Sequence, residues 1–143
     1  MPERLSLEGP AYVGADFNGD GLKDIFIGGA RLQAPKLLVQ HNDGSFESIE
    51  NKIFNQDALF EDIDADAFDF ELDGDLDIYV MSGGNEFVDG DNNLMDRLYI
   101  NDGKGNFNKF PANLPSTNGG SISSSDFNND GFPDLFIGSR SIP

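Results

Sequence analysis

Short apolar runs alternate with polar turns along the whole chain, and Asp, Asn and Gly separate the runs. The runs are rich in β-branched and aromatic residues, which favours β-strands joined by tight turns. No segment sustains an apolar period of 3.6 residues over three turns, so no helix is expected. Ten strands are predicted, at residues 12–15, 24–28, 36–41, 46–49, 65–68, 77–81, 97–101, 107–110, 121–125 and 134–138.

Internal repeats organise these strands. Residues 16–28 and 126–138 match at 9 of 13 positions, and a divergent copy begins at Asp69. Two Asn-Asp-Gly turns, each followed by a Phe, lie between the copies and indicate hairpins. Each complete unit therefore has four short strands, which is the pattern of a β-propeller blade. We predict an all-β fold of about two and a half four-stranded antiparallel blades, at about residues 11–50, 58–111 and 120–143. Residues 51–57 and 112–119 are predicted linkers, and 86–93 a polar loop within the second blade.

The repeated segments carry the spacing Asp-x-Asn-x-Asp-Gly-x-x-Asp, which is that of a calcium loop. Positions 1, 3, 5 and 9 offer side-chain oxygens, position 6 is a turn glycine, and position 7 offers a backbone carbonyl. Calcium prefers several hard oxygen ligands, and we expect about three Ca²⁺ sites. The predicted ligands are Asp16, Asn18, Asp20, Leu22 and Asp24; Asp69, Glu71, Asp73, Asp75 and Asp77; and Asp126, Asn128, Asp130, Phe132 and Asp134.

Two other interpretations of these acidic loops are an EF-hand and a metal-free turn. An EF-hand requires a Glu at position 12 within a following helix, but Ile27, Val80 and Ile137 occupy that position in β-rich runs. Solvated Asx turns without a metal would explain one acidic loop, although three copies with matched spacing favour a cation. Glu71 departs from the pattern, and its longer side chain makes the second loop the weakest of the three predictions.

Composition narrows the function classes. The 26 acidic and 9 basic residues give a formal net charge of −17, which argues against nucleic acid and against an anionic membrane surface. No apolar stretch is long enough to span a bilayer, so no membrane insertion is expected. Cysteine is absent, which excludes disulfides and thiolate chemistry within this sequence. His41, the single histidine, is expected on the surface.

Two further sets of residues are predicted to have structural roles. Asp62, Asp64 and Asp66 alternate with apolar residues, which indicates a strand with a solvated polar face, an extra metal contact being the alternative. The repeated phenylalanines are predicted to pack between blades; these are Phe17, Phe70 and Phe127 in the loops and Phe46 and Phe107 in the hairpins.

The segment from Asp16 to Gly28, its two copies and the Asn-Asp-Gly hairpins resemble the FG-GAP/VCBS repeat family, the blades of integrin-α-like β-propellers. The stretch 75–107 is especially similar to large secreted bacterial proteins with these repeats, some of which carry ASPIC/UnbV modules. The resemblance implies calcium in the acidic loops and a location outside the cell or on the surface of a bacterium. The first residues lack a signal peptide's apolar core, so either the protein is cytoplasmic or the sequence is an internal piece of a longer exported chain; the location that the resemblance implies requires the second.

We therefore expect a non-catalytic, calcium-binding module for extracellular adhesion or protein interaction, with structural calcium. The alternative is a carbohydrate-binding lectin or an accessory module of a secreted polysaccharide-degrading enzyme. The sequence does not name a protein or glycan ligand. Because about two and a half blades leave open sheet edges, a fragment that forms homo-oligomers completing the sheet is also expected.

Overall fold

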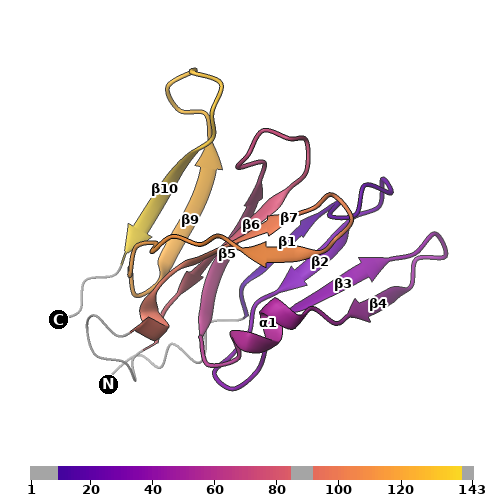
Figure 1. Ribbon diagram of the computed structural model, residues 1–143, viewed down its shortest axis with the longest axis horizontal. Helices are drawn as coiled ribbons and strands as arrows, with labels where there is room; N and C mark the ends of the chain where they lie inside the picture. The colour runs from indigo at the N-terminus through magenta and orange to yellow at the C-terminus, as the bar shows by residue number, and fades with distance from the viewer. Residues whose placement is uncertain (1–9, 85–91, 140–143) are drawn as a thin grey trace.

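The computed structural model describes residues 10–84 and 92–139, and nearly all of its regular structure is β-strand (Figure 1). The strands fall close to their predicted bounds because alternation and Asn-Asp-Gly turns are local signals. The elements are β1 Tyr12–Ala15, β2 Asp24–Ile27, β3 Lys36–Gln40, β4 Phe46–Ile49, α1 Lys52–Gln56, β5 Asp62–Phe68, β6 Asp77–Ser82, η2 Asn92–Leu94, β7 Arg97–Asn101, β8 Phe107–Lys109, β9 Gly120–Ser125 and β10 Asp134–Ser139.

The strands form three antiparallel sheets whose spatial order follows the chain order. Sheet 1 is β1-β2-β3-β4, sheet 2 is β5-β6-β7-β8, and sheet 3 is β9-β10. The sheets stack side by side, with β5 of sheet 2 between β1 of sheet 1 and β9 of sheet 3. This confirms the predicted all-β fold of about two and a half blades. Over the described residues, the sheets do not close into a ring.

The prediction that the chain has no helix was wrong at α1 and at the three-residue 3-10 helix η2. Residues 52–56, within the predicted linker, form the single turn α1, and the Asn51 side chain caps it by accepting from the Ile53 amide (3.1 Å). Five residues are too few for a helical apolar period to be visible in the sequence. Packing of the buried Phe54 against Phe26 and Tyr99, at ring-centroid distances of 5.4 and 5.0 Å, holds the turn in place. The predicted loop at 86–93 lies largely outside the described residues.

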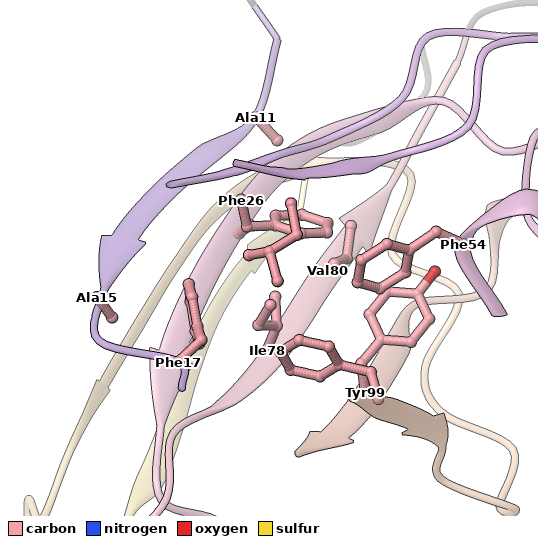
Figure 2. Packing of buried hydrophobic residues seen from close by; sticks show 11 residues of the cluster. Ala11, Ala15, Phe17, Phe26, Phe54, Ile78, Val80 and Tyr99 are labelled. Carbon is pink, nitrogen blue, oxygen red and sulfur yellow. The ribbon is translucent and has the colours of Figure 1, made fainter. Parts of the chain in front are cut away.

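The main core lies between sheets 1 and 2 (Figure 2). Strand alternation directs Phe26 from sheet 1 toward Ile78 and Val80 of sheet 2, and all three are fully buried. Phe17, from the loop after β1, packs edge-on against Phe107 of β8 at 5.8 Å between ring centroids. These two aromatic rings therefore pack between blades, as predicted.

A second core joins sheets 2 and 3, and it is smaller because sheet 3 has only two described strands. Tyr79 and Leu98 of sheet 2 pack with Ile122 of β9, and Leu135 of β10 lies against the same cluster. The blade-to-blade prediction was wrong for three phenylalanines. Phe70 packs on Phe110 of its own blade (5.2 Å between ring centroids) and is partly exposed. Phe46 and Phe127 are also exposed.

The predicted solvated face of β5 is instead a polar contact between sheets. The pairing of β5 with β6 shifts register between Asp62 and Asp64, so the strict alternation breaks there. Asp62 is buried against sheet 1, where its Oδ2 accepts from the Gly29 amide (2.6 Å). Asp64 and Asp66 are half-buried and accept from β9 amides, those of Ile122 (3.0 Å) and Ser124 (2.7 Å). Asp64 and Asp66 thus accept from β9 amides, and Asp62 accepts from an amide in the segment after β2.

Candidate metal centre

The three acidic loops connect the first and second strands of each sheet, and they lie along one edge of the molecule (Figure 1). In each loop, position 9 is the first residue of the following strand, namely Asp24 of β2, Asp77 of β6 and Asp134 of β10. Each antiparallel hairpin therefore brings the two ends of its loop together, because Ala15 pairs with Asp24, Phe68 with Asp77, and Ser125 with Asp134. Within each loop, the predicted ligands occupy a single tight turn.

The three loops share one backbone conformation. Positions 4 and 6 have positive φ in every copy, and the residues are Gly19 (77°) and Gly21 (85°), Leu72 (59°) and Gly74 (100°), and Asn129 (60°) and Gly131 (88°). The left-handed region is open to glycine and tolerable for Asn, whereas it strains a Leu. The divergent second loop therefore keeps the geometry of its neighbours in spite of an unfavourable residue at position 4.

The position 1 aspartate organises each loop by accepting backbone amides. Asp16 Oδ2 accepts from the Gly21 amide at 2.8 Å. The equivalent bonds run from the Gly74 amide to Asp69 Oδ2 and from the Gly131 amide to Asp126 Oδ2, both at 2.9 Å. This bond folds position 6 back over position 1, which turns the intervening backbone into a closed concave loop.

Position 3 separates the second loop from the other two. Asn18 Oδ1 accepts from the Asp20 amide (3.0 Å), and Asn128 Oδ1 accepts from the Asp130 amide (2.9 Å). The position 5 amide also donates to the position 1 Oδ1 in all three loops, at 3.2 Å for Asp20, 3.1 Å for Asp73 and 3.1 Å for Asp130. In the second loop the exposed Glu71 does not take the Asn role. The departure noted in the sequence is thus local to one side chain and leaves the loop backbone unchanged.

The position 9 aspartates of the first two loops join each loop to the third strand of its sheet. Asp24 is buried and accepts from the Phe17 amide (3.1 Å) and from the Gln40 amide of β3 (2.9 Å). Asp77 is also buried and accepts from the equivalent amides of Phe70 and Asn101, each at 2.8 Å. Burial raises the pKa of Asp77, and the two amide donors oppose that shift. Position 9 thus has a structural role in addition to the ligand role predicted for it.

Asn101 is a residue that the sequence analysis missed at this edge. Its buried Nδ2 donates to the Phe17 carbonyl of the first loop (2.8 Å) and to the Leu76 carbonyl of the second (3.0 Å). One side chain at the end of β7 therefore fixes two acidic loops relative to each other. The only signal in the sequence was its place at the start of an Asn-Asp-Gly turn.

The donor set of the loops suits a hard cation. The side chains at positions 1, 3, 5 and 9 bear only oxygen acceptors, apart from the amide nitrogens of Asn18 and Asn128. A carboxylate that accepts one amide on each oxygen retains further lone pairs, so the bonds described above leave capacity for a metal. Within residues 10–84 and 92–139, no three His, Asp or Glu side chains already converge as a metal-holding group.

The electrostatics of the second loop also favour a cation nearby. The half-buried Asp75 carboxylate lies close to Gly103 in the neighbouring hairpin, where an added Cβ would come within 2.8 Å of Asp75 Oδ2. Desolvation raises the pKa of Asp75, and so does repulsion from the carboxylates of Asp73, Asp69 and Asp102. A bound cation would relieve this repulsion.

A buried ionic network, which the sequence did not reveal, lies between sheets 1 and 2, away from the acidic loops. Arg97 of β7 pairs with Asp62 and lies 3.9 Å from Asp57, with each of these side chains at most 3% exposed. Asp57 also pairs with Lys109 and accepts from the Tyr99 hydroxyl (2.7 Å). These partners are up to 52 residues apart in the chain, so no local pattern could have identified them.

The antiparallel sheets stack in chain order, and each has an acidic loop between its first two strands. This architecture defines a protein of the β-propeller blade class. Comparison with known families makes the assignment specific. The chain belongs to the FG-GAP-like repeat family, whose sequence model matches residues 16–80 and 69–137. The two matches overlap, and each begins at the first residue of an acidic loop. A comparison with curated proteins finds no match.

Among the helices of the described residues, none is long and apolar enough to cross a membrane. The exposed His41 forms a surface pair with Glu47 (Nε2 to Oε2, 3.1 Å), as expected for a histidine beside a hairpin turn.

Proposed function

We propose that this chain is a non-catalytic, calcium-binding propeller module that mediates adhesion or protein interaction outside a bacterial cell. One observation supports calcium most strongly: three loops at one edge share the same backbone conformation, with oxygen donors at equivalent positions. Membership of the FG-GAP-like repeat family supports the integrin-like character of the module. The rigid stacked sheets would present their connecting loops as the partner surface.

Calcium in these loops would be structural. An ion that binds only the folded loop stabilises the protein by about 2.7 kcal/mol per site at a free concentration 100 times the dissociation constant. Extracellular calcium modules commonly bind at roughly 10⁻⁴–10⁻³ M, which matches a location outside the cell. Before binding, the closely spaced carboxylates repel one another, so the apo protein is expected to be less stable.

Thermal unfolding of the whole chain with calcium and with chelator tests this proposal. Calcium is expected to raise the melting temperature and chelator to reverse the rise. Asp20→Ala and Asp130→Ala should each reduce the rise by removing one ligand from one loop. Asp43→Ala is the matched control, because this exposed acidic residue lies in a hairpin turn outside the loops. An identical melting curve with and without calcium would overturn the proposal.

Carbohydrate binding is the second candidate, and one feature favours it. A groove of about 1030 Å³ lies at the opposite end of β2 from the acidic loop, and amide side chains of Gln33, Asn51 and Asn55 help to line it. Amide and carboxylate groups are suited to hydrogen-bonding sugar hydroxyls. Binding on a glycan array that is lost in Asn51→Ala or Asn55→Ala variants would favour this candidate over protein adhesion. An array without signal would argue against it.

A further inference from the structure

The turn between β7 and β8, at residues 101–106, lies between the first and second acidic loops, and we call it the bridging hairpin. On one side, a Cβ added at Gly105 would lie 3.8 Å from the Cβ of Asn18, in the first loop. On the other side, a Cβ added at Gly103 would come within 2.8 Å of the Asp75 carboxylate, in the second loop. The bridging hairpin therefore contacts both loops closely.

Asn101 fixes this arrangement, because its buried side-chain amide has a partner for every hydrogen-bonding group. Its Oδ1 accepts from the amides of Gly103 and Gly105, each at 3.2 Å, which holds the bridging hairpin. Its Nδ2 has two hydrogens, and it donates to the carbonyls of Phe17 (2.8 Å) and Leu76 (3.0 Å). The two acidic loops together therefore set the orientation of one side chain.

The two carbonyls that Asn101 binds belong to the ligand-bearing parts of the loops. Phe17 directly follows Asp16, the position 1 ligand predicted for the first loop. Leu76 directly precedes Asp77, the position 9 ligand predicted for the second loop. A backbone movement at either ligand thus shifts a carbonyl that Asn101 holds, and the shift is transmitted to the other loop.

We propose that calcium binding in the first loop strengthens calcium binding in the second, and the reverse, through Asn101. This inference rests on the proposed function, in which the loops bind calcium. An ion that orders one loop also fixes its carbonyl and the Asn101 amide, so less conformational entropy remains to be lost when the other loop is ordered. Thermodynamic linkage makes the effect equal in both directions. Asn101 is a positioning residue, since it acts through Phe17 and Leu76.

Titration of the whole chain with calcium chloride, followed by two-dimensional amide NMR spectroscopy, reports on each loop separately. The reporters are the position 6 amides of Gly21, Gly74 and Gly131, each of which donates to the position 1 aspartate of its own loop. The Gly21 and Gly74 signals should follow curves steeper than that of a single site. The bonds of Asn101 reach only the first two loops, so the Gly131 signal should follow a single-site curve.

Two matched ligand variants test the coupling. Asp20→Ala removes a ligand from the first loop and should raise the midpoint of the Gly74 titration about fivefold, at the low end of allosteric effects. Asp130→Ala removes the equivalent ligand from the third loop and should leave the Gly74 midpoint unchanged. At physiological salt the Debye length is about 8 Å, which screens the direct effect of the lost charge.

Replacing Asn101 tests the path of the coupling. Asn101→Ala breaks the connection without a change in charge, so Gly21 and Gly74 should follow single-site curves, and adding Asp20→Ala should shift Gly74 no further. Asn106→Ala changes an exposed Asn of the same turn and should retain the coupling. Should the alanine variant fail to fold by circular dichroism, Asn101→Asp keeps the side-chain shape and removes both donors, and it should uncouple the loops in the same way.

The possible failures are distinguishable. Single-site curves for all three glycine amides in the wild type, or a Gly74 midpoint that Asp20→Ala and Asp130→Ala shift equally, would overturn the coupling and leave calcium binding intact. Coupling that persists in both Asn101 variants would show that Asn101 does not transmit it. If calcium moves none of the three glycine amides, the proposed function itself is wrong.

Discussion

Replacing Arg97 with Met removes the cation at the centre of the buried contact between sheets 1 and 2. Arg97 pairs with Asp62 and also donates to the Tyr99 hydroxyl (2.9 Å). Its guanidinium lies 4.1 Å from the centroid of the Phe60 ring. Although burial opposes the charge, the carboxylate of Asp62 keeps the pKa of Arg97 above its ordinary value. Met preserves most of the side-chain volume, so the substitution tests the charge rather than the packing.

The expected loss follows from the carboxylate that is left behind. Asp57 keeps Lys109 as a partner, whereas Asp62 loses its cation in a site where its side chain is fully buried. Removing one member of a buried ion pair costs about 3–5 kcal/mol. With a urea m-value of about 2 kcal/mol/M, the unfolding midpoint should fall by about 2 M.

A double-variant cycle measured by urea unfolding separates this account from a loss of packing. Arg97→Met with Asp62→Asn removes both charges, so the double variant should be more stable than Arg97→Met alone. The coupling between the two changes should reach about 2 kcal/mol. A loss below about 1 kcal/mol for Arg97→Met would refute the reasoning, and so would simple additivity of the two changes.

Two further changes give independent checks. Leu72→Gly relieves the strain of a positive φ at position 4 of the second loop and should raise the free energy of unfolding by about 0.5–1 kcal/mol. Leu22→Gly, in the first loop at a residue whose φ is not positive, should lower the free energy of unfolding. Equal effects of the two substitutions in urea unfolding would contradict this reasoning. Burial raises the pKa of Asp96 above its ordinary 3.8, so the folded state binds this proton more tightly than the unfolded state. The stability of the wild type relative to Asp96→Asn should therefore be greatest below pH 3.8 and should fall as pH rises through the raised pKa. A relative stability that increases with pH in urea titrations would contradict a raised pKa for Asp96.

The strands were predictable because their signals are local. Each acidic loop is bounded by short β-rich runs, and the turns at Asn42 and Asn101 mark hairpins without any reference to distant residues. The strand bounds therefore differ from the predictions by at most three residues, with the largest difference at the start of β5. The repeated loop spacing could be recognised for the same reason, because its residues are close together in the sequence. The structure shows that the three loops with this spacing share one backbone conformation.

The errors arose where distant contacts override a local pattern. Alternation predicted that Asp62, Asp64 and Asp66 share one solvated face, but the register shift in β5 directs them to contacts with different sheets. The turn α1 forms because Phe54 fills a gap between two sheets, which five residues of sequence cannot indicate. The burial of a repeated phenylalanine depends on whether a neighbouring sheet covers it, and Phe127 shows that an identical motif does not ensure this.

Counting bound ions by equilibrium dialysis against calcium tests the central proposal most directly. Three acidic loops of matching backbone conformation predict about three calcium ions per chain. Asp20→Ala should lower that number by one, and Asp43→Ala should leave it unchanged. A chain that binds no calcium at millimolar free concentration, or an Asp20→Ala variant that binds as many ions as the wild type, would contradict the account.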